Sequence, residues 1–220
     1  MQLIFLGYPG SGKGTQASLL SEKYKIPKIS TGDILREAVV KATDLGMRAK
    51  LFMDGGELVP DEVMIGLVVE RLGAPDTAAG YILDGFPRTH HQAQELDYLL
   101  MQHFHQEMTA VISLEIEKKK VIERLTSRRV CKKCGRVYNL QTDPPPADMI
   151  CETCGGNVIQ RSDDALETVL HRMDVYEEAT RPLKNYYGMQ GKLIQIDGSL
   201  SIDKVHQEIE GKLAQVVIRP

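Results

Sequence analysis

One short stretch near the start of the chain restricts its fold more than any other. Residues 7–15 read GYPGSGKGT, follow the apolar run QLIFL, and precede a segment with helical spacing of Ala17, Leu20 and Tyr24. Glycines between a strand and a helix let successive backbone N–H groups point at a phosphate, and the helix adds the positive end of its dipole. Lys13 supplies a mobile positive charge at the spacing of a phosphate-binding loop. The sequence therefore predicts strand, phosphate loop and helix in an α/β protein.

The loop departs from the general phosphate-binding motif at one position. Gly14 stands where Ser or Thr normally follows the lysine and ligates Mg²⁺, and Thr15 comes next. We therefore expect Mg²⁺ to be held by phosphate oxygens and water, which suits an ion that dehydrates reluctantly. Asp33 and Asp84 are the carboxylates that we expect to orient these waters.

Short apolar runs alternate with helical patterns along most of the chain, which predicts a parallel sheet covered by helices on both faces. Strands are expected at 2–6, 81–83, 110–116 and 192–197. Helices are expected as a pair within 30–59, from 61 onward, and at 89–102, 118–127, 163–187 and 202–215. Ser30 or Thr31 is suited to cap the first helix of the pair. In the long helix, an apolar stripe is expected to pack in the core: Leu166, Val169, Leu170 and Met173.

The stretch from 128 to 161 does not fit this alternation. It holds the run Pro144–Pro146 and two CxxC pairs, CKKC and CETC, separated by sixteen residues. Each pair precedes a glycine, and four thiolates at this spacing are typical of a closed, structural zinc site. Metal binding can fold a segment that lacks an apolar core of its own. We expect an arginine-edged lid with one zinc ion on four cysteines: Cys131, Cys134, Cys151 and Cys154.

Composition narrows the class of protein. The chain has 220 residues, 42% of them apolar, so it can bury a sizeable core. A net charge of −3 gives no preference for nucleic acid or anionic membranes, and no apolar run approaches the ~18 residues of a membrane span. Cleaving a signal peptide would destroy the loop that begins at Gly7, so we expect a cytoplasmic protein with reduced thiols. Nothing indicates an oligomer, and we expect a monomer.

Several segments, taken in order, resemble the adenylate kinase family in its long bacterial form with a zinc-bearing lid. They are GYPGSGKGT (7–15), STGDILR (30–36), GELVPDEV (56–63), YILDGFPRT (81–89) with Gln92, LTSRRVC (125–131), RSDD (161–164) and HRMDVYEEAT (171–180). The resemblance covers essentially the whole chain, and the motifs in this order are highly specific. It implies a P-loop nucleoside monophosphate kinase fold with a core of 1–29, 60–126 and 165–220, an AMP-binding segment of 30–59, and a lid of 127–164.

The resemblance also implies a reaction, the reversible transfer of a phosphoryl group from Mg·ATP to AMP, giving two ADP. The catalytic residues that it implies are Lys13, Arg88, Arg128, Arg161 and Arg172. ATP would contact Lys13 and Arg128 together with Gly10, Ser11, Gly12, Gly14, Thr15, Val137, Tyr138 and the backbone of Leu200. AMP would contact Thr31, Arg36, Glu57, Leu58, Val59, Gly85, Phe86, Pro87, Arg88, Gln92, Arg161 and Arg172.

The chemistry of phosphoryl transfer agrees with this set of residues. Charge spreads over the equatorial oxygens of the transferring group, so the protein must supply position and positive charge. Guanidinium groups from separate segments can gather around one phosphate chain, and a closing lid can exclude water. The acceptor is already ionised, so we assign no general base and give none of the six histidines a catalytic role. Asp163 and Asp164 are expected to begin the following helix and to hold lid arginines at the hinge.

Three alternatives stay open at this stage. A kinase for uridylate, cytidylate or guanylate would share the phosphate loop, but such enzymes generally lack a long lid, and Thr31 with Gln92 fits adenine. A nucleic-acid-binding NTPase with a zinc ribbon is opposed by the net charge of −3, the four Phe and the absence of Trp. An inactive, kinase-like regulator is opposed by the intact lysine and arginines.

Overall fold

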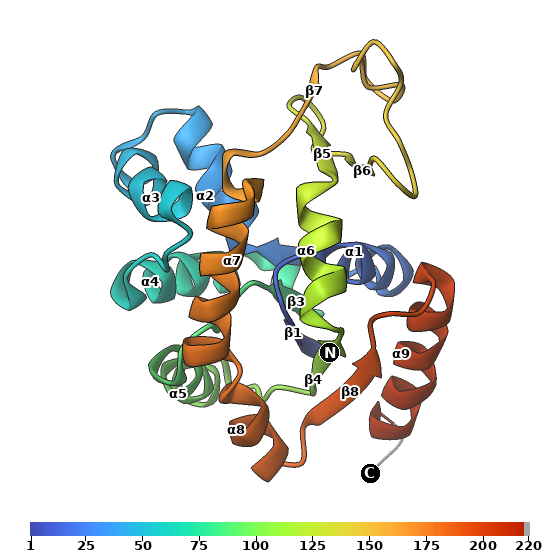
Figure 1. The fold of residues 1–220 in the computed structure, drawn as a ribbon. Coiled ribbons are helices and arrows are strands. Elements are labelled where there is room, and N and C mark those ends of the chain that lie inside the picture. The colour runs from blue at the N-terminus through green and yellow to red at the C-terminus, as the bar shows by residue number, and fades with distance from the viewer. Residues whose placement is uncertain (218–220) are drawn as a thin grey trace.

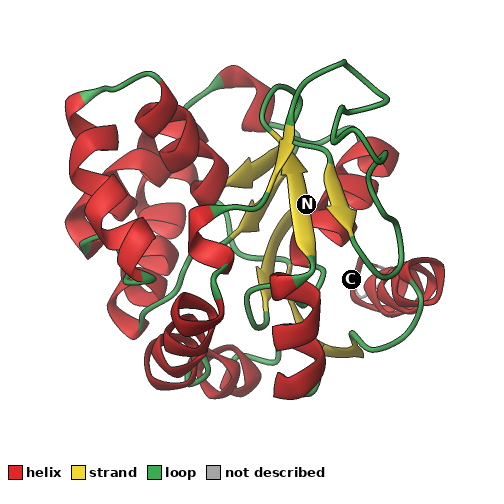
Figure 2. Cartoon of the chain, turned by 45° about the horizontal axis from the view of Figure 1, so that its top comes forward, coloured by secondary structure: helices red, strands yellow, loops and turns green. Residues whose placement is uncertain are grey.

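The computed structural model describes residues 1–217, so the end of the expected core range, 218–220, lies outside it. Its centre is a five-stranded parallel sheet, which Figure 2 shows between layers of helices. In spatial order the strands are β2 (Lys28–Ser30), β3 (Tyr81–Asp84), β1 (Gln2–Leu6), β4 (Ala110–Glu115) and β8 (Leu193–Asp197). Leu3 pairs with Ile82 on one side and Ala110 on the other. The expected α/β class is confirmed.

Helices cover both faces of the sheet because side chains alternate along each strand. Leu3 and Phe5 of β1 pack toward α1 (Lys13–Tyr24) and α9 (Ile202–Val217). On the opposite face, Ile4 and Leu6 pack toward α4 (Asp61–Leu72), α5 (His90–Leu99) and α8 (Leu183–Met189). None of the helices within residues 1–217 has both the length and the apolar character needed to cross a bilayer.

Two smaller units stand above the carboxyl ends of the strands (Figure 1). One is the helix pair α2 (Thr31–Val40) and α3 (Asp44–Gly55), where the Ser30 hydroxyl caps α2. The other is a three-stranded antiparallel sheet in the order β6 (Val137–Asn139), β5 (Arg128–Cys131), β7 (Val158–Ile159). It is carried by α6 (Lys118–Thr126) and α7 (Leu166–Val175), which pack together through their buried side chains.

Two expectations from the sequence are wrong, and one strand forms where none was expected. The strand at 28–30 was not anticipated, because three residues carry no periodicity and pairing with β3 alone makes them a strand. The long helix at 163–187 is broken: after α7 comes a π-helical turn (Tyr176–Thr180), and α8 begins only after Pro182, which has no N–H to donate. Leu166 and Leu170 are 55% and 41% exposed, while Val169 and Met173 of the same stripe are buried.

Candidate active site

The phosphate loop takes the conformation that its glycines allow. Gly7, Gly10 and Gly12 have φ of 137°, 81° and 104°, in the region that side chains disfavour. A Cβ on Gly10 would also lie 2.7 Å from Cγ of Leu125 in α6. The Lys13 ammonium donates to the carbonyls of Gly7 and Tyr8, both at 2.8 Å, so the lysine closes over its own loop. The loop thus offers backbone N–H groups, a helix N-terminus and one ammonium at the same place.

Asp84 and Asp33, the two carboxylates expected near Mg²⁺, lie in different surroundings. Asp84 ends β3, next to β1, and a Cβ on Gly14 would lie 3.2 Å from its Oδ2. Asp33 lies in the first turn of α2, where it pairs with Arg36. Burial acts to raise the pKa of Asp33, but Arg36 and the Ser30 hydroxyl hold it below its usual value. Asp84 is therefore the carboxylate beside the loop, and Asp33 the one that fixes an arginine.

The fold brings the five arginines named from the sequence and Lys13 into one positive cluster. The pKa of Lys13 is lowered to about 8, chiefly by burial; Asp84 opposes this shift, and the charges of Arg88, Arg172 and Arg128 contribute to it. Burial also lowers the pKa of Arg172 to about 10, with Arg128 and Arg161 acting in the same direction. The charge of Arg36 acts on both Arg88 and Arg161. Such mutual repulsion is relieved when an anion enters the cluster.

Asp163 and Asp164 hold three of these arginines at the point where the lid joins α7. Asp164, fully buried, accepts two hydrogen bonds from Arg128. Asp163 accepts two from Arg161, both at 2.9 Å, and also pairs with Arg172 at 2.9 Å. Three guanidinium groups thus share two carboxylates, and one positive charge remains uncompensated. This geometry confirms the expected link between these aspartates and the lid arginines.

Apart from Arg161 and Arg172, the residues expected around AMP lie between the start of α2 and the start of α5. The Gly85 carbonyl accepts hydrogen bonds from Thr31 Oγ1 at 2.9 Å and from Arg88 Nε at 2.8 Å. The bond between Phe86 and Pro87 is cis, and both residues are buried. At the end of α3, Gly56 packs against Arg172, and the Glu57 carboxylate contacts His171 Nε2 at 2.6 Å. Leu58 and the buried Val59 follow directly.

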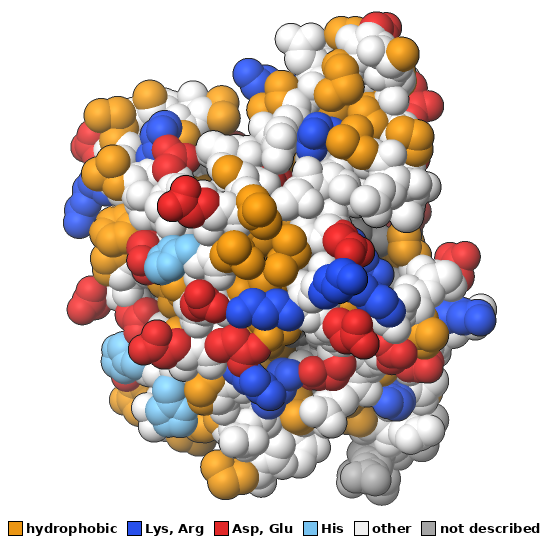
Figure 3. Space-filling model, in the orientation of Figure 1, with side chains coloured by type: hydrophobic (Ala, Val, Ile, Leu, Met, Phe, Trp, Pro, Cys, Tyr) orange, Lys and Arg blue, Asp and Glu red, His pale blue; other side chains and the backbone are white. Residues whose placement is uncertain are grey.

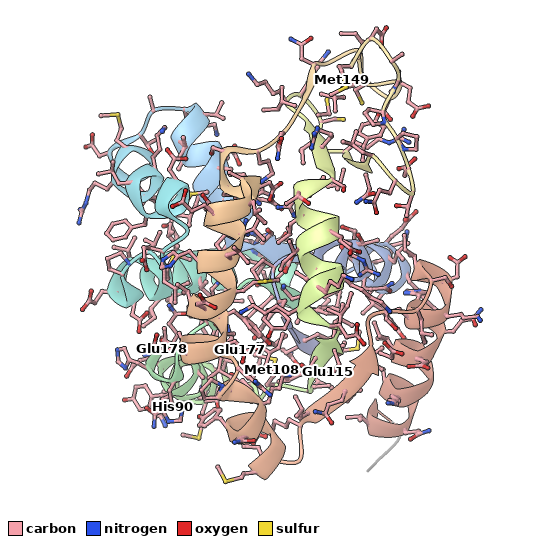
Figure 4. The ribbon with its side chains drawn as sticks, in the orientation of Figure 1. His90, Met108, Glu115, Met149, Glu177 and Glu178 are labelled. Atoms are coloured by element: carbon pink, nitrogen blue, oxygen red, sulfur yellow. The ribbon has the colours of Figure 1, made fainter. Side chains whose placement is uncertain are left out.

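The four cysteines of the lid gather into one cluster. Their Sγ atoms all lie within 4.8 Å of one another, with Cys131–Cys154 at 3.4 Å and Cys134–Cys151 at 3.7 Å. A tetrahedron with metal–sulfur bonds of about 2.3 Å has edges of about 3.8 Å, so these thiols fit one metal ion. Met149, labelled in the lid in Figure 4, packs against the cluster. The expectation of a single four-cysteine site is confirmed in its geometry.

Tyr138, expected from the sequence to contact ATP, is buried within the lid. Its side chain is 1% exposed and donates a hydrogen bond to Cys151 Sγ at 3.2 Å, which lowers the pKa of that thiol to about 6. The ring therefore packs with the cysteine cluster and supports it. Val137 is exposed beside it, and Leu200 packs its side chain against the core near α9.

A hollow of about 550 Å³ lies between α8 and the strands β4 and β8, and none of the clustered arginines lines it. Its charged groups already pair with one another, Lys184 with Glu115 at 2.6 Å and Arg181 with Glu177 at 2.6 Å. Figure 3 shows acidic and basic side chains interspersed on this face of the molecule. The hollow therefore offers no uncompensated charge of the kind that the phosphate loop does.

Two polar residues at the site were missed in the sequence. The sequence indicates only that Asp61 begins a helix within the motif GELVPDEV and that Thr89 ends the motif YILDGFPRT. In the structure Asp61 accepts hydrogen bonds from Thr89 Oγ1 and from Gln92 Nε2, both at 2.7 Å. Nothing in the sequence marks this contact, because the partners lie 28 and 31 residues away.

Comparison with known proteins agrees with this geometry. A family model described as adenylate kinase matches residues 5–192. The chain is 53% identical to an adenylate kinase of Archaeoglobus fulgidus over 98% of its own length and 99% of the relative's. An adenylate kinase of Carboxydothermus hydrogenoformans is 49% identical over 97% of this chain and 99% of its own length. An adenylate kinase of Kosmotoga olearia is 51% identical over 95% of this chain and 97% of its own length. With the phosphate loop, the arginine cluster and the family match in agreement, this chain belongs to the adenylate kinase family.

Proposed function

We propose that the protein catalyses reversible phosphoryl transfer from Mg·ATP to AMP, giving two ADP. One observation carries the proposal: Lys13 and five arginines from separate segments lie in one repelling cluster beside the phosphate loop. Such a cluster suits a chain of phosphates that links two nucleotides, because fixed guanidinium groups stabilise the charge that develops on the equatorial oxygens.

In this proposal the ATP phosphates lie on residues 10–15, with Lys13 over the β- and γ-phosphates. Arg88, Arg161 and Arg172 contact the AMP phosphate and the transferring group, and Arg128 reaches the ATP side from the base of the lid. Arg36 completes the AMP phosphate site, and Thr31 and Gln92 face the base. The bond from oxygen to the γ-phosphorus of ATP breaks as an AMP phosphate oxygen forms the new one, so no proton needs to move.

The proposal divides the chain into a core of 1–29, 60–126 and 165–220, an AMP-binding segment of 30–59 and a lid of 127–164. Lid and AMP-binding segment stand on opposite sides of the carboxyl ends of the strands (Figure 1). Their approach brings the lid arginines to the transferring group and excludes water. All the charged groups of the site come from one chain, which supports a monomer as the active form.

Two metal ions belong to the proposal. One zinc ion on the four cysteines is a structural ion, because four thiolates leave no open position for substrate. Mg²⁺ arrives with ATP, with Asp84 beside Gly14 as the carboxylate placed to orient its waters. A tetrathiolate lid requires reduced cysteines, which supports a cytoplasmic location.

One assay tests the reaction. Purified protein is incubated with Mg·ATP and, separately, AMP, UMP, CMP or GMP, and diphosphate formation is followed. We expect AMP to be the preferred acceptor and ATP to be stable without it. Preference for another monophosphate would support one of the other kinases, and ATP loss without an acceptor would support an NTPase. Native mass spectrometry should show one zinc per chain, and light scattering a monomer.

A further inference from the structure

Gln92 is held by a closed set of hydrogen bonds between α4 and α5. Its side chain is 2% exposed, Nε2 donates to Asp61 Oδ1 at 2.7 Å, and Oε1 accepts from the Arg88 N–H at 2.7 Å. The other carboxylate oxygen of Asp61 accepts from Thr89 Oγ1 at 2.7 Å, and Thr89 Oγ1 accepts from the Gln92 N–H at 3.1 Å. Asp61 thus uses both carboxylate oxygens to fix the residues around Gln92.

These contacts determine which way the Gln92 amide points. The oxygen and nitrogen of an amide have nearly the same shape, so the partners decide its orientation. An ionised carboxylate only accepts and a backbone N–H only donates, so Asp61 requires the nitrogen and Arg88 requires the oxygen. A flipped amide would face donor to donor at Arg88 and acceptor to acceptor at Asp61. Two partners with opposite requirements therefore select one orientation.

We propose that Asp61 is a positioning residue that sets the base selectivity of the acceptor site by fixing the Gln92 amide. Each of the two amide atoms has one further hydrogen-bonding position, a lone pair on Oε1 and an N–H on Nε2. This pair is complementary to a 6-aminopurine, whose amino group donates and whose N1 accepts. A 6-oxopurine presents the reverse pattern, an accepting O6 and a donating N1–H. The inference rests on the proposed function, in which AMP is the acceptor.

The position of Asp61 suits this role. It is the first residue of α4, where a carboxylate is stabilised by the helix dipole. Thr89 caps α5, and the two helices pack side by side (Figure 1). The Arg88 carbonyl is held from a third element, by Thr180 Oγ1 at 2.8 Å. The amide is thus fixed by the first residue of α4 and by the turn before α5, which is itself held by Thr180, and such support is what discrimination between two similar ligands requires.

The test compares Asp61→Ala with Asp61→Asn, with AMP and IMP as acceptors. Asp61→Ala removes both accepting oxygens. We expect the KM for AMP to rise about tenfold and the KM for Mg·ATP to stay unchanged. The preference for AMP over IMP, measured as the ratio of their kcat/KM values, should fall about tenfold. Asparagine can still accept from Gln92 Nε2, so it should restore most of the preference. Glu62→Gln is the matched control: the neighbouring carboxylate is exposed, and its removal should change none of these values.

A double-mutant cycle separates positioning from a general structural effect. If Asp61 acts through Gln92, then Asp61→Ala added to Gln92→Ala should cause no further loss of the preference for AMP. Asp61→Leu, of larger volume and also without an acceptor, replaces Asp61→Ala if thermal melting shows that the alanine variant is unfolded. An unchanged AMP to IMP preference, or equal losses for ATP and AMP, would overturn the inference while leaving the reaction intact. A wild-type protein that does not phosphorylate AMP would instead overturn the proposed function, and the inference with it.

Discussion

Lys13 at the phosphate loop has a lowered pKa, so its protonation should respond to a bound ligand. In the free protein burial lowers its pKa to about 8, and a bound triphosphate raises this pKa by adding negative charge. Between the two pKa values, binding takes up a proton. Affinity for Mg·ATP should therefore be constant below pH 8 and fall by up to about tenfold per pH unit above it.

Calorimetry measures this directly. Titrations at pH 9 in two buffers of different ionisation enthalpy should show proton uptake on binding, and titrations at pH 6.5 should show none from this lysine. Lys13→Arg is the control, because a guanidinium stays charged throughout and should remove the pH dependence, whatever it does to affinity. Equal proton uptake by the wild type and this variant at pH 9 would contradict the assignment.

Asp164 is the buried half of an ion pair, and its removal should cost more than removal of an exposed partner. Asp164→Asn leaves the Arg128 guanidinium with a neutral partner, and the Asp164 side chain that is replaced is 0% exposed. Loss of one partner of a buried pair costs about 3–5 kcal/mol in free energy of unfolding. The matched control is Asp174→Asn, whose exposed pair with Lys118 should contribute less than about 1 kcal/mol. Urea denaturation of both variants checks the difference; similar losses would show that Asp164 is not paired in solution.

At the scale of elements, the lid is built from two equivalent zinc knuckles, which are turns that each hold one CxxC pair and the glycine after it (131–135 and 151–156). In each, the N–H of the glycine after the second cysteine donates to the carbonyl of the first, Gly135 to Cys131 at 3.0 Å and Gly155 to Cys151 at 2.8 Å. Both glycines have positive φ, 74° and 69°. The turns direct backbone N–H groups at the sulfurs, which favours thiolates. Tyr138 and Val158 supply the small apolar core that packs against the cysteines.

A glycine in the second knuckle allows the two turns to meet. A Cβ on Gly156 would lie 2.6 Å from Lys133 Cβ and 2.9 Å from Cys131 Sγ. Gly156→Ala should therefore displace a ligand and weaken zinc binding by roughly 10–100-fold, as changes around a metal site commonly do. Gly211→Ala in α9 is the control: no atom lies within 4 Å, and removing a helix-interior glycine should stabilise by about 1 kcal/mol. Competition with a chromogenic chelator measures the zinc affinity, and an unchanged value for Gly156→Ala would contradict the close approach.

At the scale of the whole molecule, the lid and the parallel sheet have separate cores. The lid packs around its cysteines, whereas the sheet is buried between two larger apolar clusters. Between them, at the hinge, Arg128 and Asp164 form an ion pair. The lid should thus depend on its metal while the sheet does not.

Chelation should show this division. Removing zinc from the intact protein is expected to disorder 127–164, make it sensitive to protease, and lower kcat, because Arg128 would no longer be held at the base of the lid. Most of the far-UV circular dichroism should remain, since the helices and the five-stranded sheet lie in the core. Re-addition of zinc should restore the activity. Complete unfolding on chelation would show instead that the two cores fold as one unit.

The fold and the identity of the site followed from local patterns. The strand, loop and helix at residues 2–24 and the paired cysteines are short-range signals, because the residues that act together lie within a few turns of chain. Motif order then named Lys13 and the arginines, and the structure places them in one cluster. The exposed Leu166 and Leu170 show where prediction from local patterns fails. Helical spacing indicates which side chains share a face of the helix, but it does not indicate whether another element covers that face.

What the sequence by itself determined is the set of groups: the phosphate loop, the arginines, the four thiols and the alternation that makes a parallel sheet. Only the tertiary structure decided which of them touch. It buried Tyr138 against Cys151, divided two carboxylates among three arginines, and joined Asp61 to Gln92 across 31 residues. Residue type and spacing determine the chemistry that a group can perform. The burial of that group and its partners depend instead on how distant segments pack together, and a local sequence pattern does not predict this packing.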